Sequence, residues 1–157
     1  MLLTKFLLAA LLFSTPGSQH PVGEMEFPEG TVQHVVTAEG IQWKPCAPGL
    51  PSGCEIAVLE GNPQSAGMFT VRFRVTGEFV MPHHTHPQNE RVTVLSGKMA
   101  VAFGKDATRE SAKRFGPGDY YVNARGAIHV VWADEPSVIQ ITGIGPWIAE
   151  FVDDSSN

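Results

Sequence analysis

Three of the chain's six histidines fall within residues 83–97, His83-His84-Thr85-His86-Pro87-Gln88-Asn89-Glu90-Arg91-Val92-Thr93-Val94-Leu95-Ser96-Gly97. Side chains two apart on a β-strand point to the same side, about 6.5–7 Å apart at Cα. The rings of His84 and His86 can therefore converge on one ion, while His83 faces the other way. After a turn, Glu90 opens a returning strand, where its carboxylate can supply an oxygen ligand. The pattern predicts a metal site built on a β-hairpin.

A fourth candidate ligand, His129, ends the segment Gly116-Pro117-Gly118-Asp119-Tyr120-Tyr121-Val122-Asn123-Ala124-Arg125-Gly126-Ala127-Ile128-His129. The segment indicates a turn, a short strand, a second turn and a strand that carries the histidine. A histidine cluster can also be a fortuitous surface patch, and the isolated His20 and His34 are read as ordinary histidines. Four residues of ligand type on neighbouring strands instead favour one divalent transition metal per chain, with manganese, iron, zinc and copper left open. His83 is kept as the alternative to His84.

Turn residues separate many short apolar runs along the chain, and this pattern is typical of an antiparallel sandwich or barrel. The sequence predicts strands over residues 32–36, 41–44, 55–59, 68–75, 79–84, 90–96, 98–103, 119–122, 127–131, 138–142 and 147–152. Only residues 106–113 are compatible with a helical turn. We therefore expect an all-β protein.

The spacing of these residues resembles the two motifs of the cupin superfamily. The first motif matches Gly77, His84, His86, Glu90 and Gly97, and the second matches Gly118, Gly126 and His129. The chain departs from the motifs by one extra residue between Gly77 and His84, by Ala124 in place of a proline and by Ala133 where an asparagine often stands. The resemblance implies a double-sheet jelly-roll β-barrel and a metal held by His84, His86, Glu90 and His129.

In a cupin barrel the strand after the second motif lines the cavity. Gln140 and Thr142 share one face of that strand, so the resemblance makes them candidates for contacts to substrate or water; the alternative is that they face solvent. Glu60, Glu78 and Tyr121 lie near the motifs in sequence, but no spacing fixes any of them as an acid or base. The catalytic residues therefore remain unassigned.

Residues 1–18 are typical of a secretory signal peptide, with one positive charge, an apolar run too short to span a membrane and an exit of small residues. A membrane anchor is the alternative. We expect a flexible arm over residues 19–30, a cupin β-barrel domain over 31–152 and a polar tail over 153–157. The predicted location is periplasmic or secreted.

Cys46 and Cys54 bracket a turn-rich segment, Ala47-Pro48-Gly49-Leu50-Pro51-Ser52-Gly53. In an oxidising compartment this arrangement favours one intramolecular disulfide, with two free thiols as the alternative. The formal net charge of −5, without basic clusters, argues against a nucleic-acid partner and against stable attachment to an anionic membrane.

Three imidazoles and one carboxylate leave coordination positions open, which distinguishes a reactive metal site from a structural one. The preferred function is an exported metal-dependent enzyme with redox chemistry, dioxygenase-like or oxidase-like, on a small oxygenated substrate. The alternatives are a metal-dependent isomerase or lyase, and a binding module that captures a small molecule without turnover. A homodimer is expected because the predicted strand at 32–36 would leave a sheet edge that needs a partner.

Overall fold

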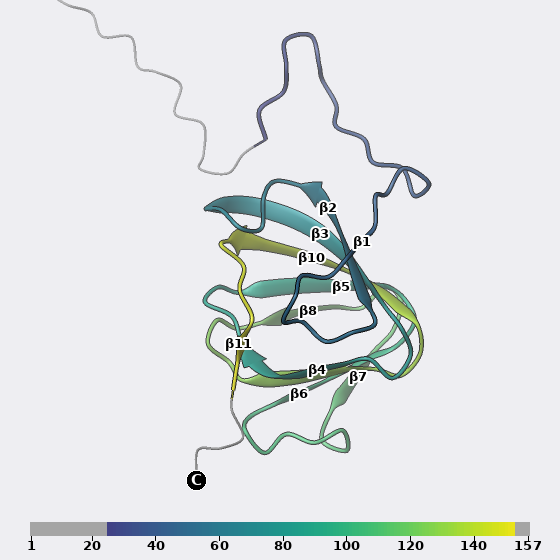
Figure 1. The fold of residues 1–157 in the computed structure, drawn as a ribbon, viewed down its shortest axis with the longest axis vertical. Helices are drawn as coiled ribbons and strands as arrows, with labels where there is room; N and C mark the ends of the chain where they lie inside the picture. The colour runs from purple at the N-terminus through teal and green to yellow at the C-terminus, as the bar shows by residue number, and fades with distance from the viewer. Residues whose placement is uncertain (1–24, 153–157) are drawn as a thin grey trace, which may run out of the picture.

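The fold is an antiparallel β-barrel made of two sheets, and the computed structural model describes residues 25–152 (Figure 1). The leader predicted at 1–18 and the tail predicted at 153–157 lie outside the described residues. A six-stranded sheet has the order β1-β2-β3-β10-β5-β8, and a five-stranded sheet has the order β11-β4-β9-β6-β7. The strands are β1 (Lys44–Pro45), β2 (Cys54–Glu60), β3 (Gly67–Val75), β4 (Val80–Thr85), β5 (Glu90–Ser96), β6 (Met99–Phe103), β7 (Lys113–Phe115), β8 (Tyr120–Asn123), β9 (His129–Ala133), β10 (Ser137–Gly145) and β11 (Glu150–Phe151).

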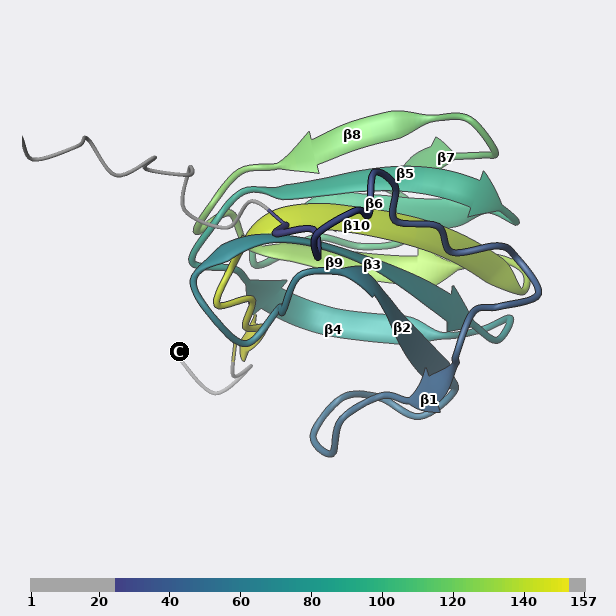
Figure 2. The same cartoon turned by 90° about the horizontal axis from the view of Figure 1, so that it is seen from above.

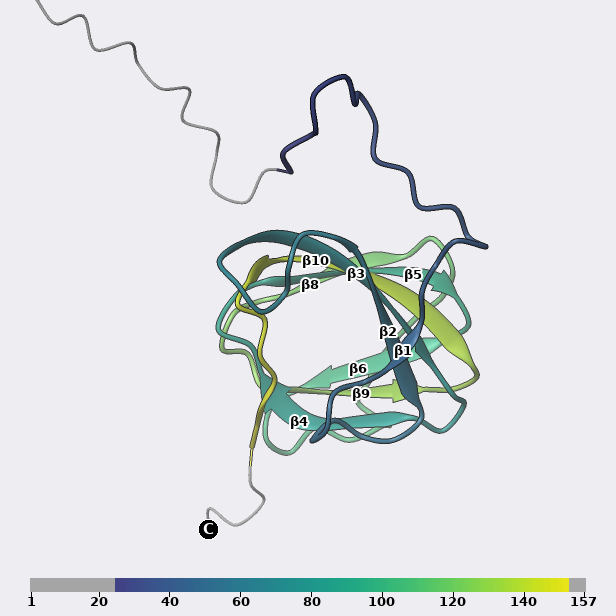
Figure 3. The ribbon, with the colours of Figure 1, turned by 45° about the horizontal axis from the view of Figure 1, so that its top comes forward.

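The core fills the space between the two sheets, which face each other in the view of Figure 3. Alternation of apolar and polar residues along β3 turns its apolar residues inward. The buried core includes Phe69, Val71, Phe73, Val75, Val92, Val94, Met99, Ala133, Ile139 and Ile141. Burying one apolar face of each sheet against the other accounts for the predicted all-β jelly-roll architecture.

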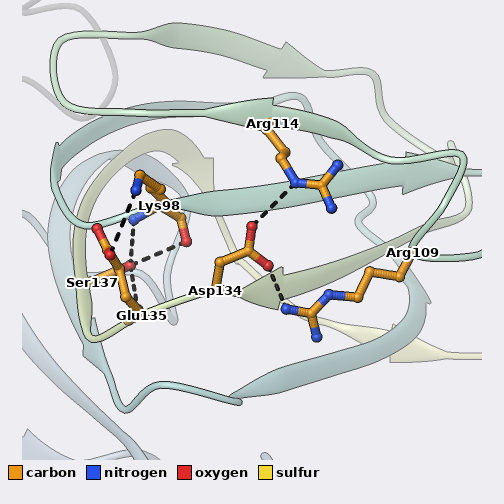
Figure 4. Close-up of polar contacts among 6 residues, drawn as sticks. All are labelled: Lys98, Arg109, Arg114, Asp134, Glu135 and Ser137. Carbon is orange, nitrogen blue, oxygen red and sulfur yellow. Dashed lines mark hydrogen bonds and ion pairs between the residues drawn. The ribbon is translucent and has the colours of Figure 1, made fainter.

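Gly97 has a clear structural reason for its place in the first motif. Its φ is +79°, and an added Cβ would lie 2.2 Å from Oγ of Ser137. That hydroxyl also accepts a hydrogen bond of 3.0 Å from the backbone N–H of Lys98 (Figure 4). The turn between β5 and β6 is thereby fixed against the start of β10.

Asp134, directly after β9, holds the segment between β6 and β8 in place. Its two carboxylate oxygens accept hydrogen bonds from Arg109 and Arg114, as Figure 4 shows. The helical turn predicted at 106–113 is wrong: this segment consists of turns followed by β7. Eight residues are too few for a stable helix without packing support, and local hydrogen bonds between Thr108 and Ser111 compete with helix formation.

Three strand predictions near the chain ends are also corrected. Residues 32–36 form no strand and lie outside the barrel, with Nε2 of His34 2.8 Å from the carbonyl oxygen of Leu59. The strands predicted at 41–44 and 147–152 shrink to the two-residue β1 and β11. β-propensity alone does not make a strand, because a strand also needs a partner edge with which to pair. Among residues 25–152 we find no helix with the length and apolar character needed to cross a membrane.

Candidate metal centre

His84, His86 and His129 meet at one end of the barrel interior. His84 lies near the end of β4, His86 follows that strand, and His129 opens β9 directly across from His84 in the antiparallel register. The ring centroids of His84 and His129 are 4.1 Å apart, and those of His84 and His86 are 4.8 Å apart. All three residues are buried, with 1–3% of their surface exposed. Strand pairing, rather than chance surface proximity, therefore brings the three rings together.

Each imidazole is oriented by a backbone carbonyl. The Nδ1 atoms of His84, His86 and His129 lie 2.7, 2.7 and 2.9 Å from the carbonyl oxygens of Pro82, Ile148 and Ala127. A carbonyl can only accept a hydrogen bond, so Nδ1 carries the proton in all three rings. The opposite nitrogen, Nε2, then presents a lone pair, as a metal-binding histidine requires.

The Nε2 side of the rings fits a metal ion. Among the described residues, the buried Nε2 atoms of His86 and His129 have no hydrogen-bond partner. One potential ligand atom from each histidine lies within 4.8 Å of the other two, so the group can hold one ion. Orphaned buried nitrogens are costly, and coordination would satisfy them.

The electrostatic environment keeps the rings of His84 and His129 neutral. Burial, followed by the nearby imidazole of His129, lowers the pKa of His84 from 6.5 to about 3. Burial also lowers the pKa of His129. Both imidazoles are therefore neutral at neutral pH, with Nε2 free of a proton and available as a ligand atom.

Glu90 lies beside the three histidines but outside the group whose ligand atoms lie within 4.8 Å of one another. Its Oε1 is 3.5 Å from Nε2 of His86, and its Oε2 is 3.8 Å from Nε2 of His129. The side chain is buried, and Nδ2 of Asn123 donates a hydrogen bond of 2.9 Å to Oε2. The first residue of β5 is thus placed next to the rings, as the sequence predicts. Asn123, at the end of β8, was missed because its distance along the chain gives no sign that it faces Glu90.

A cavity of about 70 Å³ lies next to the histidines and extends between the sheets. Its volume accommodates several water molecules or a small organic group. Tyr121 and Trp147 contribute to its wall, together with His84, His86 and Glu90. Burial, and then the negative charge of Glu90, raise the pKa of Tyr121 well above its usual range, so its hydroxyl stays protonated.

Trp147 covers the histidine site from the segment that follows β10. Its ring stacks on that of His86, with centroids 5.4 Å apart and planes inclined by 19°. It also contacts Phe73, with ring centroids 5.5 Å apart. The sequence predicted only a strand over residues 147–152, whereas the structure packs this partly buried tryptophan against the core.

Gln140 and Thr142 lie away from the cavity. The cavity wall is built by Ile139 and Ile141, the inward residues of β10. Gln140 accepts a hydrogen bond of 3.1 Å from Nε of Arg72, and the Thr142 hydroxyl is 3.2 Å from that of Thr70. Successive side chains on a strand point to opposite faces, so Gln140 and Thr142 point away from the face that Ile139 and Ile141 turn to the cavity. This placement argues against the substrate-contact role predicted for Gln140 and Thr142.

The remaining candidates also lie outside the site. His83 is half-buried and does not belong to the histidine group. His84 and His86 point to the same side, as expected from alternation along the strand. Glu60 lines a surface hollow beside the N-terminal segment rather than the cavity. Glu78, with φ of 67°, occupies the turn before β4. Neither carboxylate is placed to act on a molecule in the cavity.

A disulfide joins Cys46 to Cys54 and closes the loop between β1 and β2. Figures 1 and 2 show this loop along one side of the barrel, next to β2 and β4. Leu50 from the loop and Cys54 both contribute to the cavity wall. Disulfides of this kind persist in oxidising compartments.

The two-sheet barrel and its histidine group are those of a cupin. The family described as the ChrR cupin-like domain matches residues 31–147, and the chain belongs to this family. A comparison with curated protein sequences finds no match.

Solved structures of cupins share the fold at low sequence identity. The polyketide cyclase RemF from Streptomyces resistomycificus is 17% identical with a TM-score of 0.65, over 80% of this chain and 89% of that one. An acetylacetone dioxygenase from Acinetobacter johnsonii is 18% identical with a TM-score of 0.61, over 88% of this chain and 87% of that one. KdgF from Halomonas sp. is 19% identical with a TM-score of 0.53, over 75% of this chain and 95% of that one. At these identities the likeness concerns the fold.

Proposed function

We propose that this protein is a metal-dependent enzyme that acts on a small molecule, with one divalent transition ion held by His84, His86, His129 and Glu90. The observation that carries the proposal is the shared orientation of the three imidazoles: each Nδ1 is tied to a carbonyl, and the ligand atoms converge within 4.8 Å. Manganese, iron, zinc and copper all accept such a donor set.

Redox chemistry, of a dioxygenase or oxidase kind, is the preferred reaction class. A bound redox-active ion would supply the electron chemistry, while the chain orients the substrate and excludes water. Among the described residues that line the cavity, Glu90 is the one carboxylate, and the imidazoles are those of the proposed ligands. If these groups coordinate the ion, proton abstraction by a separate base has no candidate, which disfavours the isomerase or lyase alternative.

Tyr121 has the role of a neutral donor in this proposal. Its hydroxyl stays protonated near Glu90, so it can donate a hydrogen bond to a substrate oxygen but cannot serve as a base at neutral pH. Fold neighbours named as an acetylacetone dioxygenase and a polyketide cyclase are compatible with enzymatic activity on small molecules. The second candidate, a metal-assisted binding module, is favoured by the same shortage of a free base.

Metal analysis of the purified protein, followed by an oxygen-consumption screen, tests the proposal. The wild type should carry about one ion per chain, and His86→Ala should carry none because a buried ligand is lost. His83→Ala, a matched change three residues earlier, should retain the ion. Full occupancy in His86→Ala would contradict the ligand assignment, and a loaded protein that binds small molecules without turnover would favour the binding module.

We also propose that the protein is exported to the periplasm or secreted. The leader-like residues 1–18 and the disulfide both support this location. Protein recovered from the exported fraction should have lost the leader, giving an N-terminus near residue 18 or 19. An intact mass that retains the leader would contradict export by this route.

A homodimer is proposed on the basis of exposed apolar residues before the barrel. Val32 is 94% exposed and Val35 is 60% exposed, so the segment at 32–36 offers apolar surface to a second copy. Light scattering at micromolar concentration should give twice the mass of one mature chain, and removal of residues 19–36 should reduce it. A mass of one chain in both cases would contradict the dimer.

A further inference from the structure

The cavity beside the histidines is apolar almost throughout. Apart from the site residues and Tyr121, its wall is formed by Leu50, Cys54, Phe73, Val75, Phe79, Met81, Val92, Met99, Val131, Ile139, Ile141 and Trp147. These side chains come from both sheets and from the disulfide-closed loop, so they surround a bound molecule rather than touching it on one side. Most of the contact with such a molecule would therefore be apolar.

The formal charge in the described wall of this cavity is negative. Among the described residues of its wall, Glu90 carries the one formal charge, and no lysine or arginine is present. The arginines of β3 lie on the opposite face of that strand. Nε of Arg72 donates to Gln140 at 3.1 Å, and Nε of Arg74 donates to Glu55 at 2.5 Å. An anionic group placed away from the histidines would thus be buried without a cation and in the field of a carboxylate.

The polar groups in the wall other than the proposed ligands suit an uncharged partner. Tyr121 remains a neutral hydroxyl, and Trp147 carries a buried Nε1–H without a hydrogen-bond partner among the described residues. Neutral donors can satisfy a carbonyl or hydroxyl oxygen, but they do not replace the counter-ion that a buried carboxylate needs.

We infer that this cavity selects small, uncharged, mainly apolar molecules that present oxygen donors to the histidine end, and that it rejects molecules with a carboxylate at the far end. The inference rests on the proposed function for the metal, and it narrows the substrate class of the same site. Selection arises because the metal and the neutral donors satisfy the oxygens, while the apolar wall offers nothing to a remote charge.

A matched pair of probes tests the selection. 4-Methylcatechol and 3,4-dihydroxybenzoate present the same two adjacent oxygens, and they differ at the opposite end by a methyl group against a carboxylate. Zinc-loaded protein avoids turnover, because zinc has no redox chemistry. In calorimetric titrations at pH 7 we expect 4-methylcatechol to bind at least tenfold more tightly. Equal or tighter binding of 3,4-dihydroxybenzoate, or no binding of 4-methylcatechol, would overturn the inference.

Two variants connect the preference to charge inside the cavity. Met81 is half-buried and lines the cavity, so Met81→Lys introduces the missing cation and should shift the ratio of the two affinities at least tenfold toward 3,4-dihydroxybenzoate. Met68, exposed on β3 and absent from the cavity wall, gives the control Met68→Lys, which should leave the ratio unchanged. An unchanged ratio in Met81→Lys would overturn the inference.

Zinc stoichiometry, measured before the probes are added, separates the two proposals. A protein that fails to bind zinc contradicts the metal site. The charge preference is then decided by the same titrations on metal-free protein, where the apolar wall is still present and the neutral probe must bind more tightly. A protein that binds one zinc ion but prefers the anionic probe keeps the metal site and loses the inferred substrate class.

Discussion

Nδ2 of Asn123 donates a hydrogen bond of 2.9 Å to Oε2 of Glu90, and both side chains are buried. The pair connects the end of β8 to the start of β5, where Glu90 and Asn123 face each other in the antiparallel register. Asn123 thereby fixes the carboxylate that lies against two of the histidines. Groups that orient a metal ligand in this way contribute to metal affinity through the ligand that they hold.

Replacing Asn123 should therefore weaken both the fold and the metal site. In Asn123→Ala the buried carboxylate loses a donor, so we expect the free energy of unfolding of the metal-free protein to fall by about 1–3 kcal/mol. Metal affinity should fall by about 10–100-fold. Urea unfolding and competitive metal titration measure the two effects. Asn62→Ala, at an exposed turn, is the control, and equal losses in both variants would show that Asn123 has no special role.

The metal-free protein should lose stability on acidification. His84 has a pKa of about 3 in the folded state against 6.5 in the unfolded chain, so only the unfolded chain takes up this proton between those values. The contribution from His84 is constant above pH 6.5 and falls by at most about 1.4 kcal/mol for each pH unit below it, until pH reaches about 3. Urea unfolding is measured at a series of pH values. The free energy of unfolding of His84→Gln should depend less steeply on pH, whereas that of the exposed His34→Gln should depend on pH as in the wild type. Identical slopes in all three proteins would contradict the lowered pKa.

Removing the disulfide should destabilise the barrel and open its cavity. The Cys46–Cys54 bond closes a loop with a sequence separation of eight, and loss of the cross-link should cost about 2.5 kcal/mol by chain entropy. Leu50 would no longer be held against the cavity, so binding of apolar probes should weaken as well. The Cys46→Ser/Cys54→Ser variant is compared with wild type in urea unfolding and probe titration. Wild-type stability and unchanged probe binding would show that the loop needs no cross-link.

Trp147 should report directly on the metal. Its ring stacks on His86, so a paramagnetic ion such as Ni²⁺ bound at the histidines should quench its fluorescence. Trp147→Phe should lose most of this quenching and about 1 kcal/mol of stability, because the stacking and the contacts with neighbouring aromatic rings are reduced. Trp43→Phe, at a position under Arg74, should retain the quenching. Quenching that disappears only with Trp43→Phe would place the bound ion elsewhere.

Tyr121→Phe should separate binding of the metal from action on the substrate. The phenyl ring keeps its packing against Phe115, whose ring centroid is 4.2 Å away, so stability and metal occupancy should stay close to wild type. Turnover of a substrate that uses the hydroxyl should fall at least about tenfold, within the range known for positioned donors. Unchanged turnover would remove Tyr121 from the proposed chemistry.

The sequence predicted the central strands and the histidine pair well because both depend on local alternation. Along β3, β5 and β10, alternate residues are buried on one face, and the same rule places His84 and His86 together. Side chains also alternate between the two faces of β10, but the cupin resemblance led us to assign its polar face to the cavity. The structure has the apolar face there, because this cavity wall is mainly apolar.

The remaining errors arise where a side chain depends on distant partners. Residues 32–36 are of types that favour strands, but they have no partner strand. Trp147 contacts His86 because of the path that the chain takes after β10. The pairing of Asn123 with Glu90 depends on the register between β5 and β8. None of these contacts is encoded by periodicity within a single segment.

The carbonyl of Ile148 that orients His86 belongs to the last described segment of the chain, just before the two residues of β11 that pair with β4. An ion bound at the histidines would hold that ring, and through it the segment, against the barrel. A carboxypeptidase should consequently stop before Ile148 in the loaded protein and advance further once a chelator is present. Resistance of this end of the chain to digestion is thus a direct measure of how full the site is.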